Sequence, residues 1–143
     1  MFAIISSLIA GICMAFQGVF NTRLNEKIGI WETNLIVQII GLILTIIIVS
    51  TFGSGNIKNI KNCNKLYLSG GILGVIIIYT VIHGIGSLGP TFSTELILIA
   101  QLVSASLIDA FGLFDTQRTR FDAPKIIGVL MMIVGIVIFK YKR

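Results

Sequence analysis

The stretch TNLIVQIIGLILTIIIVSTF, residues 33–52, is twenty residues long and carries no charged side chain. A helix needs about 20 mostly apolar residues to cross the hydrocarbon core of a bilayer. This stretch therefore predicts a membrane-spanning helix. Four more apolar stretches lie on either side of it, at about residues 2–21, 66–85, 92–114 and 124–139, each bounded by polar or turn-forming residues. We expect an all-α membrane protein with five transmembrane helices in a single domain, residues 1–143.

The composition agrees with a membrane protein and excludes other classes. Of the 143 residues, 55% are apolar and only 12% are charged, whereas a soluble domain has about 25% charged residues. A soluble enzyme and a disordered chain are thereby excluded. The net charge of +5 comes from eleven basic residues spread along the chain, too few for a nucleic-acid-binding surface. Cys13 and Cys63 match no zinc or disulfide pattern, so we expect no metal and no cofactor.

The basic residues are divided almost equally between the two sides of the membrane. With five spans, the side of the N-terminus carries six of the eleven Lys and Arg residues and the other side carries five. The six are Lys58, Lys61, Lys65, Arg118, Arg120 and Lys125, and the five are Arg23, Lys27, Lys140, Lys142 and Arg143. Since an excess of Lys and Arg marks the cytoplasmic side, this split sets no orientation. We expect dual topology and an antiparallel dimer with ten helices; alternatively, Arg23 and Lys27 hold the N-terminus outside.

Several segments carry a resemblance to a known family over essentially the whole chain. They are QGVFNTRL (17–24), GGILG (70–74), the Leu88-Gly89 turn, QLVSASLIDAFGLF (101–114), Arg120, and Gly128 with Gly135. The chain resembles the YdcZ-type inner-membrane exporters, which are five-helix half-transporters of the drug/metabolite transporter superfamily. Ala100 is a departure, because the family often has glycine before the glutamine. The resemblance implies an inner-membrane location and export of a small solute.

Two of the six acidic residues fall inside a predicted span, and intramembrane ionisable groups are candidates for function. Glu95 and Asp109 lie on one helix, about 21 Å apart along its axis. Asp109 is expected to be a proton or cation site or a partner for a cationic substrate, or else a carboxylate near the helix end that reaches the interface or pairs with Arg118 or Arg120. Glu95 is expected either at one mouth of the pathway or at the first turn of its helix, where a carboxylate complements the helix dipole.

Neutral polar side chains recur at helical spacing within the spans. Such stripes line a wet cavity or form hydrogen bonds between helices. Stripes at Met14, Gln17 and Asn21, at Asn34, Gln38, Gly41 and Thr45, and at Tyr79 and His83 follow this spacing. Our candidates for a substrate or ion pathway are Gln17, Asn21, Gln38, His83, Glu95, Gln101, Ser104 and Asp109. His83 is alternatively an interfacial residue.

The glycines in the spans suggest close helix packing. Gly70 and Gly74 present a small-residue face to another helix, and Gly128 with Gly135 does the same on the last span. Residues 127–138 of that span contain no polar side chain. We expect the last span to be a packing or dimerisation helix that does not line a pathway.

The leading functional hypothesis is a secondary transporter of the inner (plasma) membrane that exports a small metabolite or toxic compound by alternating access. Its partners would be the lipid bilayer, a small-molecule substrate and a second copy in antiparallel orientation, or a paralogue. The better-known four-helix relatives use a glutamate in their first helix. Residues 2–21 contain no acid, which favours a neutral or zwitterionic substrate. The alternative is a non-transporting membrane assembly subunit that stabilises or regulates a partner membrane protein. The chain shows neither the charge ring of a channel nor a catalytic constellation, so no enzyme is expected.

Overall fold

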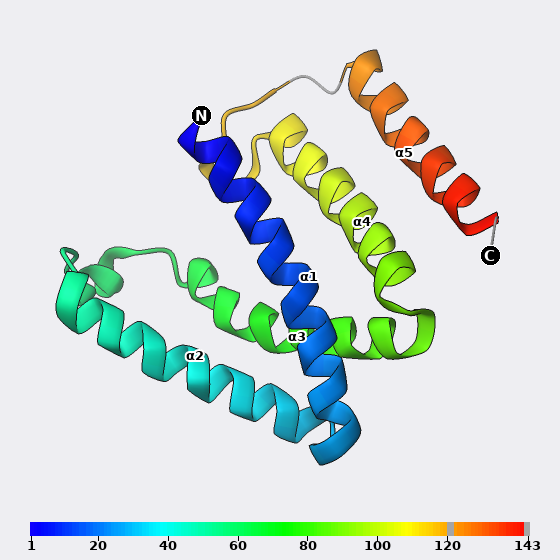
Figure 1. The fold of residues 1–143 in the computed structure, drawn as a ribbon. Coiled ribbons are helices and arrows are strands. Elements are labelled where there is room, and N and C mark those ends of the chain that lie inside the picture. The colour runs from blue at the N-terminus through cyan, green and yellow to red at the C-terminus, as the bar shows by residue number, and fades with distance from the viewer. Residues whose placement is uncertain (120–121, 142–143) are drawn as a thin grey trace. The chain divides into compact units, whose positions relative to one another are not determined.

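The computed structural model describes residues 1–119 and 122–141, and within these residues the chain is helical (Figure 1). Five helices in the described part are long and apolar enough to cross a membrane. They are α1 (Phe2–Ile28), α2 (Ile30–Phe52), α3 (Gly70–Leu88), α4 (Pro90–Phe111) and α5 (Ala123–Tyr141), with short 3₁₀ helices η1 (Ile57–Asn62), η2 (Lys65–Ser69) and η3 (Leu113–Asp115). The prediction of an all-α chain with five candidate spans is confirmed.

Two pairs of consecutive helices are separated by one glycine each. Gly29 (φ 95°) follows α1 and precedes α2, and Gly89 (φ 80°) stands between α3 and α4. Glycine tolerates these positive φ angles because it has no Cβ. Pro90 then begins α4, where its missing N–H costs no hydrogen bond. Helix α1 ends only at the Gly29 turn, so it extends to Ile28 and is longer than the predicted 2–21.

The other helix ends differ from the prediction by a few residues. A 3₁₀ turn precedes α3, so the α-helix begins at Gly70 and not at residue 66. Asn64 Oδ1 accepts a hydrogen bond from the backbone N–H of Leu66 and holds that turn. Helix α4 ends at Phe111 and not at the predicted residue 114. Gly112 adopts a left-handed conformation there and donates its N–H to the carbonyls of Asp109 and Ile108.

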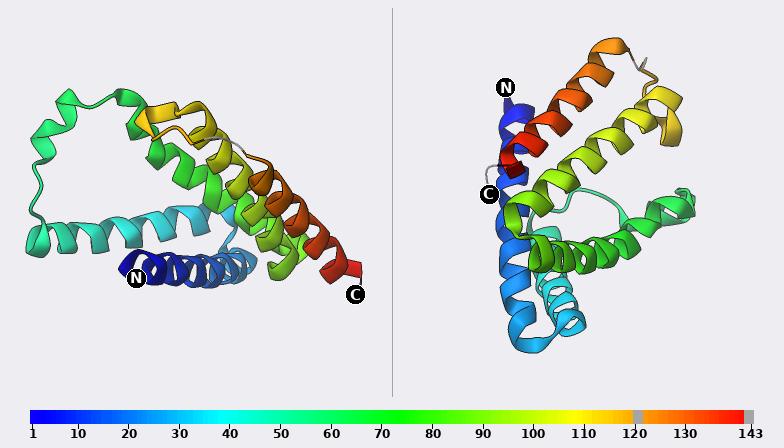
Figure 2. Two further views of the ribbon diagram at one scale, coloured as in Figure 1. Left: turned by 90° about the horizontal axis from the view of Figure 1, so that it is seen from above. Right: turned by 90° about the vertical axis from the view of Figure 1, so that its right-hand side faces the viewer.

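The chain divides into two compact units. The first, residues 1–87, contains α1, α2 and nearly all of α3. Within it α2 and α3 run in opposite directions and are joined by the segment that holds η1 and η2 (Figure 2). The second unit, residues 88–143, contains α4 and α5, which form a helical hairpin.

The few side chains that are buried in a single copy are mostly polar. Among the described residues, Ile82 and Ile85 are the only buried apolar side chains, with 1% and 7% of their surface exposed. The buried polar side chains are Asn21, Thr22, Thr33, Asn34 and Ser93. Most Ile, Leu and Val side chains of the five helices are exposed. Apolar side chains outside and polar groups inside suit a chain whose surroundings are lipid.

Candidate functional site

The first half of α2 lies against α3 through an aromatic pair and a hydrogen bond. Trp31 stacks on Tyr79, with ring centroids 4.9 Å apart and an angle of 21° between the rings. One turn further along α2, Asn34 Nδ2 donates a hydrogen bond of 2.8 Å to the carbonyl oxygen of Val75. Asn34 is 3% exposed, so its amide is satisfied inside the protein. This member of the predicted polar stripe on α2 therefore binds a neighbouring helix. Trp31 likewise contacts α3 through its stack on Tyr79.

The stripe continues toward the middle of α2. A Cβ added at Gly74 would lie 3.4 Å from Gln38 Nε2, so Gln38 reaches α3 where α3 has no side chain. The Gln38 residue is nevertheless exposed in the monomer. Thr45, at the far end of the stripe, donates its hydroxyl to the carbonyl of Gly41 within its own helix. The α2 stripe thus changes from interhelical contact near Asn34 to a free face near Thr45.

Helix α1 approaches α3 at a glycine. A Cβ added at Gly18 would lie 2.6 Å from Ile85 Cδ1 and 3.2 Å from Val81 Cγ1. Gly18 is buried, and Thr22 donates its hydroxyl to the carbonyl of Gly18 at 2.8 Å. The contact needs the small residue, because a larger side chain at position 18 would displace Ile85. Gly18 belongs to the segment 17–24 that the sequence singled out, but close packing had been expected of other glycines.

Two further polar groups are enclosed in the same unit. Asn21, a predicted pathway residue, is 6% exposed. Thr33 is fully buried, and its hydroxyl has no hydrogen-bond partner among the described residues. A buried hydroxyl without a partner costs about 1–3 kcal/mol. Sequence reasoning missed Thr33, because a threonine near a helix start has no distinctive pattern.

The remaining predicted pathway residues of the first unit face outward in a single copy. Gln17 lies near the middle of α1 and is exposed. His83 is exposed on α3, one turn beyond Tyr79. The structure therefore encloses Asn21 and leaves Gln17 and His83 on the surface of the chain.

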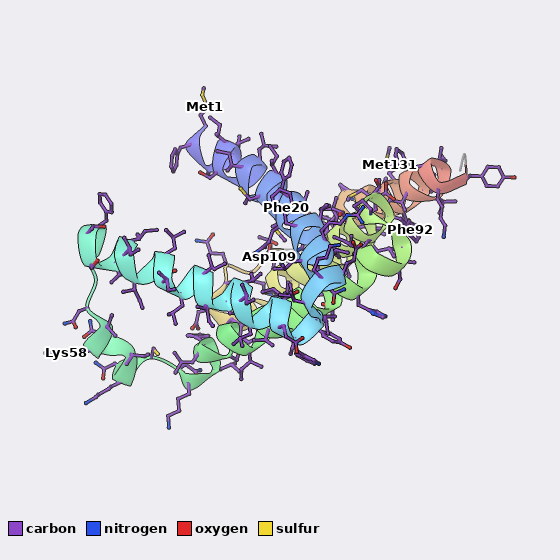
Figure 3. The ribbon with its side chains drawn as sticks, turned by 60° about the horizontal axis from the view of Figure 1, so that its bottom comes forward. Met1, Phe20, Lys58, Phe92, Asp109 and Met131 are labelled. Carbon is purple, nitrogen blue, oxygen red and sulfur yellow. The ribbon has the colours of Figure 1, made fainter. Side chains whose placement is uncertain are left out.

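Helix α4 carries the other candidates. Gln101, near its middle, and Ser104 are both exposed, and Asp109 in its last turns is half-buried. Figure 3 shows Phe92 on the first part of α4 and Asp109 far along the same helix. The sequence prediction that Asp109 and Glu95 lie in one helix is thereby met, since α4 spans Pro90–Phe111.

The segment after α4 folds back on the helix end that carries Asp109. The carbonyl of Asp109 accepts the backbone N–H of Thr119 at 2.9 Å, and Arg118 Nε donates to the carbonyl of Ala110 at 3.1 Å. Within the described residues, no ion pair joins the Asp109 carboxylate to Arg118. Arg120, the other partner considered, lies outside the described residues.

Glu95 lies in a different environment, at the open end of the α4–α5 hairpin. It lines a cavity of about 240 Å³ together with Leu88, Thr91, Phe92, Phe139 and Lys140. Its Oε2 atom is enclosed and has no hydrogen-bond partner among the described residues. Lys140 places Nζ 4.0 Å from the centroid of the Phe92 ring. Sequence reasoning missed Phe92 and Lys140, because only the hairpin brings these distant positions together.

The glycines predicted for packing are not equivalent. Gly74 faces Gln38, whereas a Cβ added at Gly70, Gly128 or Gly135 would meet no atom within 4 Å. The surface of α5 around Gly128 and Gly135 is therefore open in a single copy.

A family model described as "Putative inner membrane exporter, YdcZ" matches residues 2–138 of the chain, nearly its whole length. No curated protein and no solved structure matches it.

Proposed function

This chain belongs to the YdcZ family of inner-membrane exporters, and from that premise we propose that it is a secondary transporter of a small metabolite or toxic compound. Its family and its five candidate spans make it a multi-pass protein of the inner membrane. The proposal adds the mechanism: alternating access in an antiparallel homodimer, in which each chain supplies five of ten helices.

The observation that carries this proposal is the exposure of amide side chains within the membrane-spanning helices. Gln17 lies near the middle of α1 and Gln101 near the middle of α4, and both are exposed in the single copy. A side-chain amide in contact with hydrocarbon is costly unless it is hydrogen-bonded. These amides therefore need either a further helix or water beside them. An antiparallel second copy provides both, because inverted halves enclose a pathway near the membrane midplane.

The near-equal division of basic residues supports the antiparallel arrangement, since neither orientation is favoured at insertion. In the dimer we assign the pathway to Gln17, Asn21, Gln38, His83, Gln101, Ser104 and Asp109. Amides and hydroxyls predominate in this set, and α1 carries no acid within residues 2–21. A neutral or zwitterionic substrate fits such a lining, with Asp109 as the ion-coupling group. The transport proposal does not include Glu95, whose surroundings are an apolar cavity with a lysine at its rim.

The test is water access to the proposed pathway. Cys13 and Cys63 are first replaced by alanine, and single cysteines are introduced at Gln17 and Gln101. Matched controls are cysteines at Ile43 and Leu130, which are each 54% exposed but lie on apolar faces. We expect a membrane-impermeant maleimide to label positions 17 and 101 in proteoliposomes and not positions 43 and 130.

The same experiment separates transport from the alternative function. A non-transporting subunit would hold both amides in dry contacts between helices. Labelling of all four positions at one low rate would then contradict the proposal and favour the assembly-subunit hypothesis.

A further inference from the structure

Two adjoining cavities lie along the α4–α5 hairpin. The first, of about 240 Å³, contains Glu95 and Lys140. The second, of about 490 Å³, is almost entirely apolar and shares Phe92 and Lys140 with the first. Its other lining residues are Leu96, Ile99, Ile133, Ile136, Val137 and Tyr141. The hairpin therefore offers an apolar groove with a carboxylate and an ammonium at one end.

The two charged groups at this end are not paired with each other. No ion pair joins Glu95 to Lys140 within the part of the chain that the structure describes. Lys140 instead lies over the Phe92 ring. Glu95 Oε2 is enclosed without a hydrogen-bond partner, and a carboxylate oxygen accepts hydrogen bonds but donates none when ionised. The site therefore lacks a positively charged donor next to Glu95, and it leaves the Lys140 ammonium free for an anion.

The charged end lies where the helices leave the hydrocarbon. Lys140 and Tyr141 are the last two residues of α5, and Tyr141 is 91% exposed. Glu95 lies in the second turn of α4. Tyrosine and lysine at the end of a span are typical of the membrane–water interface, the level of the lipid headgroups. The apolar groove extends from there toward the hydrocarbon.

We propose that the α4–α5 hairpin binds a phospholipid with a zwitterionic, primary-ammonium headgroup, as in phosphatidylethanolamine. The ammonium donates to the Glu95 carboxylate in the wall of the cavity, and the phosphate accepts from Lys140. One acyl chain fills the groove along Ile99, Ile133 and Ile136. Each charged side chain of the site thereby binds a lipid group of opposite charge, and the apolar lining contacts the acyl chain.

The class of headgroup follows because the Glu95 carboxylate requires a positively charged N–H donor. A quaternary ammonium, as in phosphatidylcholine, has no N–H and donates no hydrogen bond to the Glu95 carboxylate. An anionic headgroup would satisfy Lys140 but would place a second negative charge beside Glu95. The inference goes beyond transport and holds whether or not the chain moves a solute.

The experiment titrates the detergent-purified full chain with dioctanoyl phosphatidylethanolamine and with dioctanoyl phosphatidylcholine, and native mass spectrometry measures the bound fractions. These lipids have the same tails, so their affinity ratio reports the headgroup alone. We expect the first lipid to bind about tenfold tighter, because one hydrogen bond to a charged group is worth roughly that factor. In Glu95→Leu, which removes both the charge and the acceptor, the two lipids should bind about equally.

Two lysine variants complete the test. Lys140→Gln should weaken both lipids together, because both carry the phosphate. Lys125→Gln is the matched control at the other end of α5, where Lys125 Nζ contacts Thr119 Oγ1 at 2.9 Å. It should leave both affinities unchanged. Partial unfolding of a variant would lower the affinities for both lipids, so it would not by itself abolish the preference for phosphatidylethanolamine over phosphatidylcholine.

Equal binding of the two lipids by the unmodified chain would overturn the proposal. A preference that survives Glu95→Leu would do so as well. The same holds if neither lipid binds, the result expected if Lys140 turns inward and pairs with Glu95. None of these outcomes bears on maleimide labelling at positions 17 and 101, so the lipid site and the transport proposal fail independently.

Discussion

The side-chain amide of Asn34 on α2 donates a 2.8 Å hydrogen bond to the backbone carbonyl of Val75 on α3. The carbonyl of a helix interior already accepts a bond from its own helix, so this is an additional bond between two spans. Together with the stack of Trp31 on Tyr79 it holds the first half of α2 against α3. A polar stripe that could have lined a cavity here joins two helices.

Replacing Asn34 by leucine should therefore destabilise the fold. Hydrogen bonds between transmembrane helices contribute about 0.6–2 kcal/mol, so Asn34→Leu should lower the unfolding free energy by about 1 kcal/mol. Unfolding in mixed detergent micelles, followed by circular dichroism, measures this change. Thr45→Val is the control, because the Thr45 hydroxyl bonds only to Gly41 of its own helix. If Thr45→Val lowered the unfolding free energy as much as Asn34→Leu, the hydrogen bond between α2 and α3 would not be the cause of the loss.

The close approach of α1 to α3 predicts a size limit at Gly18. Since a Cβ there would already lie 2.6 Å from Ile85 Cδ1, Gly18→Leu should cost about 1–3 kcal/mol by overpacking. Gly11→Leu on the same helix should change stability by less than about 0.5 kcal/mol, because nothing lies within 4 Å of it. The same unfolding assay compares the two. Equal effects would mean that α1 does not approach α3 at Gly18.

The even division of basic residues predicts that small charge changes decide orientation. Arg23→Gln with Lys27→Gln leaves three basic residues on one side against six, so every copy should insert with its N-terminus in the cytoplasm. Removing Lys58, Lys61 and Lys65 leaves three against five and should give the opposite orientation. The measurement is accessibility of a C-terminal tag from each face in intact cells and inverted vesicles. The unmodified chain should be labelled from both faces, and strictly one-sided labelling would contradict dual topology.

Ion coupling is predicted to depend on Asp109. Its carboxylate has no ion pair with Arg118, and the proposed function assigns it the ion-coupling step. Asp109→Asn should abolish the proton release that accompanies substrate binding, measured with a pH indicator dye in weakly buffered detergent solution. Candidate neutral and zwitterionic solutes serve as ligands. Glu26→Gln is the control, because Glu26 forms an exposed ion pair with Arg23 outside the proposed pathway. Unchanged proton release in Asp109→Asn would remove Asp109 from the coupling step.

The fold was largely predictable from residues that are near one another in the sequence. The free energy of placing a helix in a bilayer is a sum over its own side chains, so residues 33–52 alone indicate a span. Gly89 and Pro90 likewise mark a helix boundary by their own backbone preferences. The differences at helix ends come from turns that continue a helix into polar sequence, as α1 does as far as Ile28.

The candidate sites were less predictable, for a reason particular to membranes. In a soluble helix the apolar face marks the contact with the core, but these helices are apolar nearly all round. Periodicity therefore does not distinguish a face toward lipid from a face toward another helix. It placed Asn34 and Gln38 on one stripe without indicating that α3 lies beside them.

The sequence by itself determined the number of helices, their membrane environment and the equal division of charge, because each depends on composition summed along short segments. The tertiary structure alone decided that Asn34 binds α3, that α1 contacts Ile85 at Gly18, and that Lys140 lies over Phe92 near an unpaired Glu95. These contacts join residues more than 40 positions apart. Chain folding sets such distances, and no local preference encodes them.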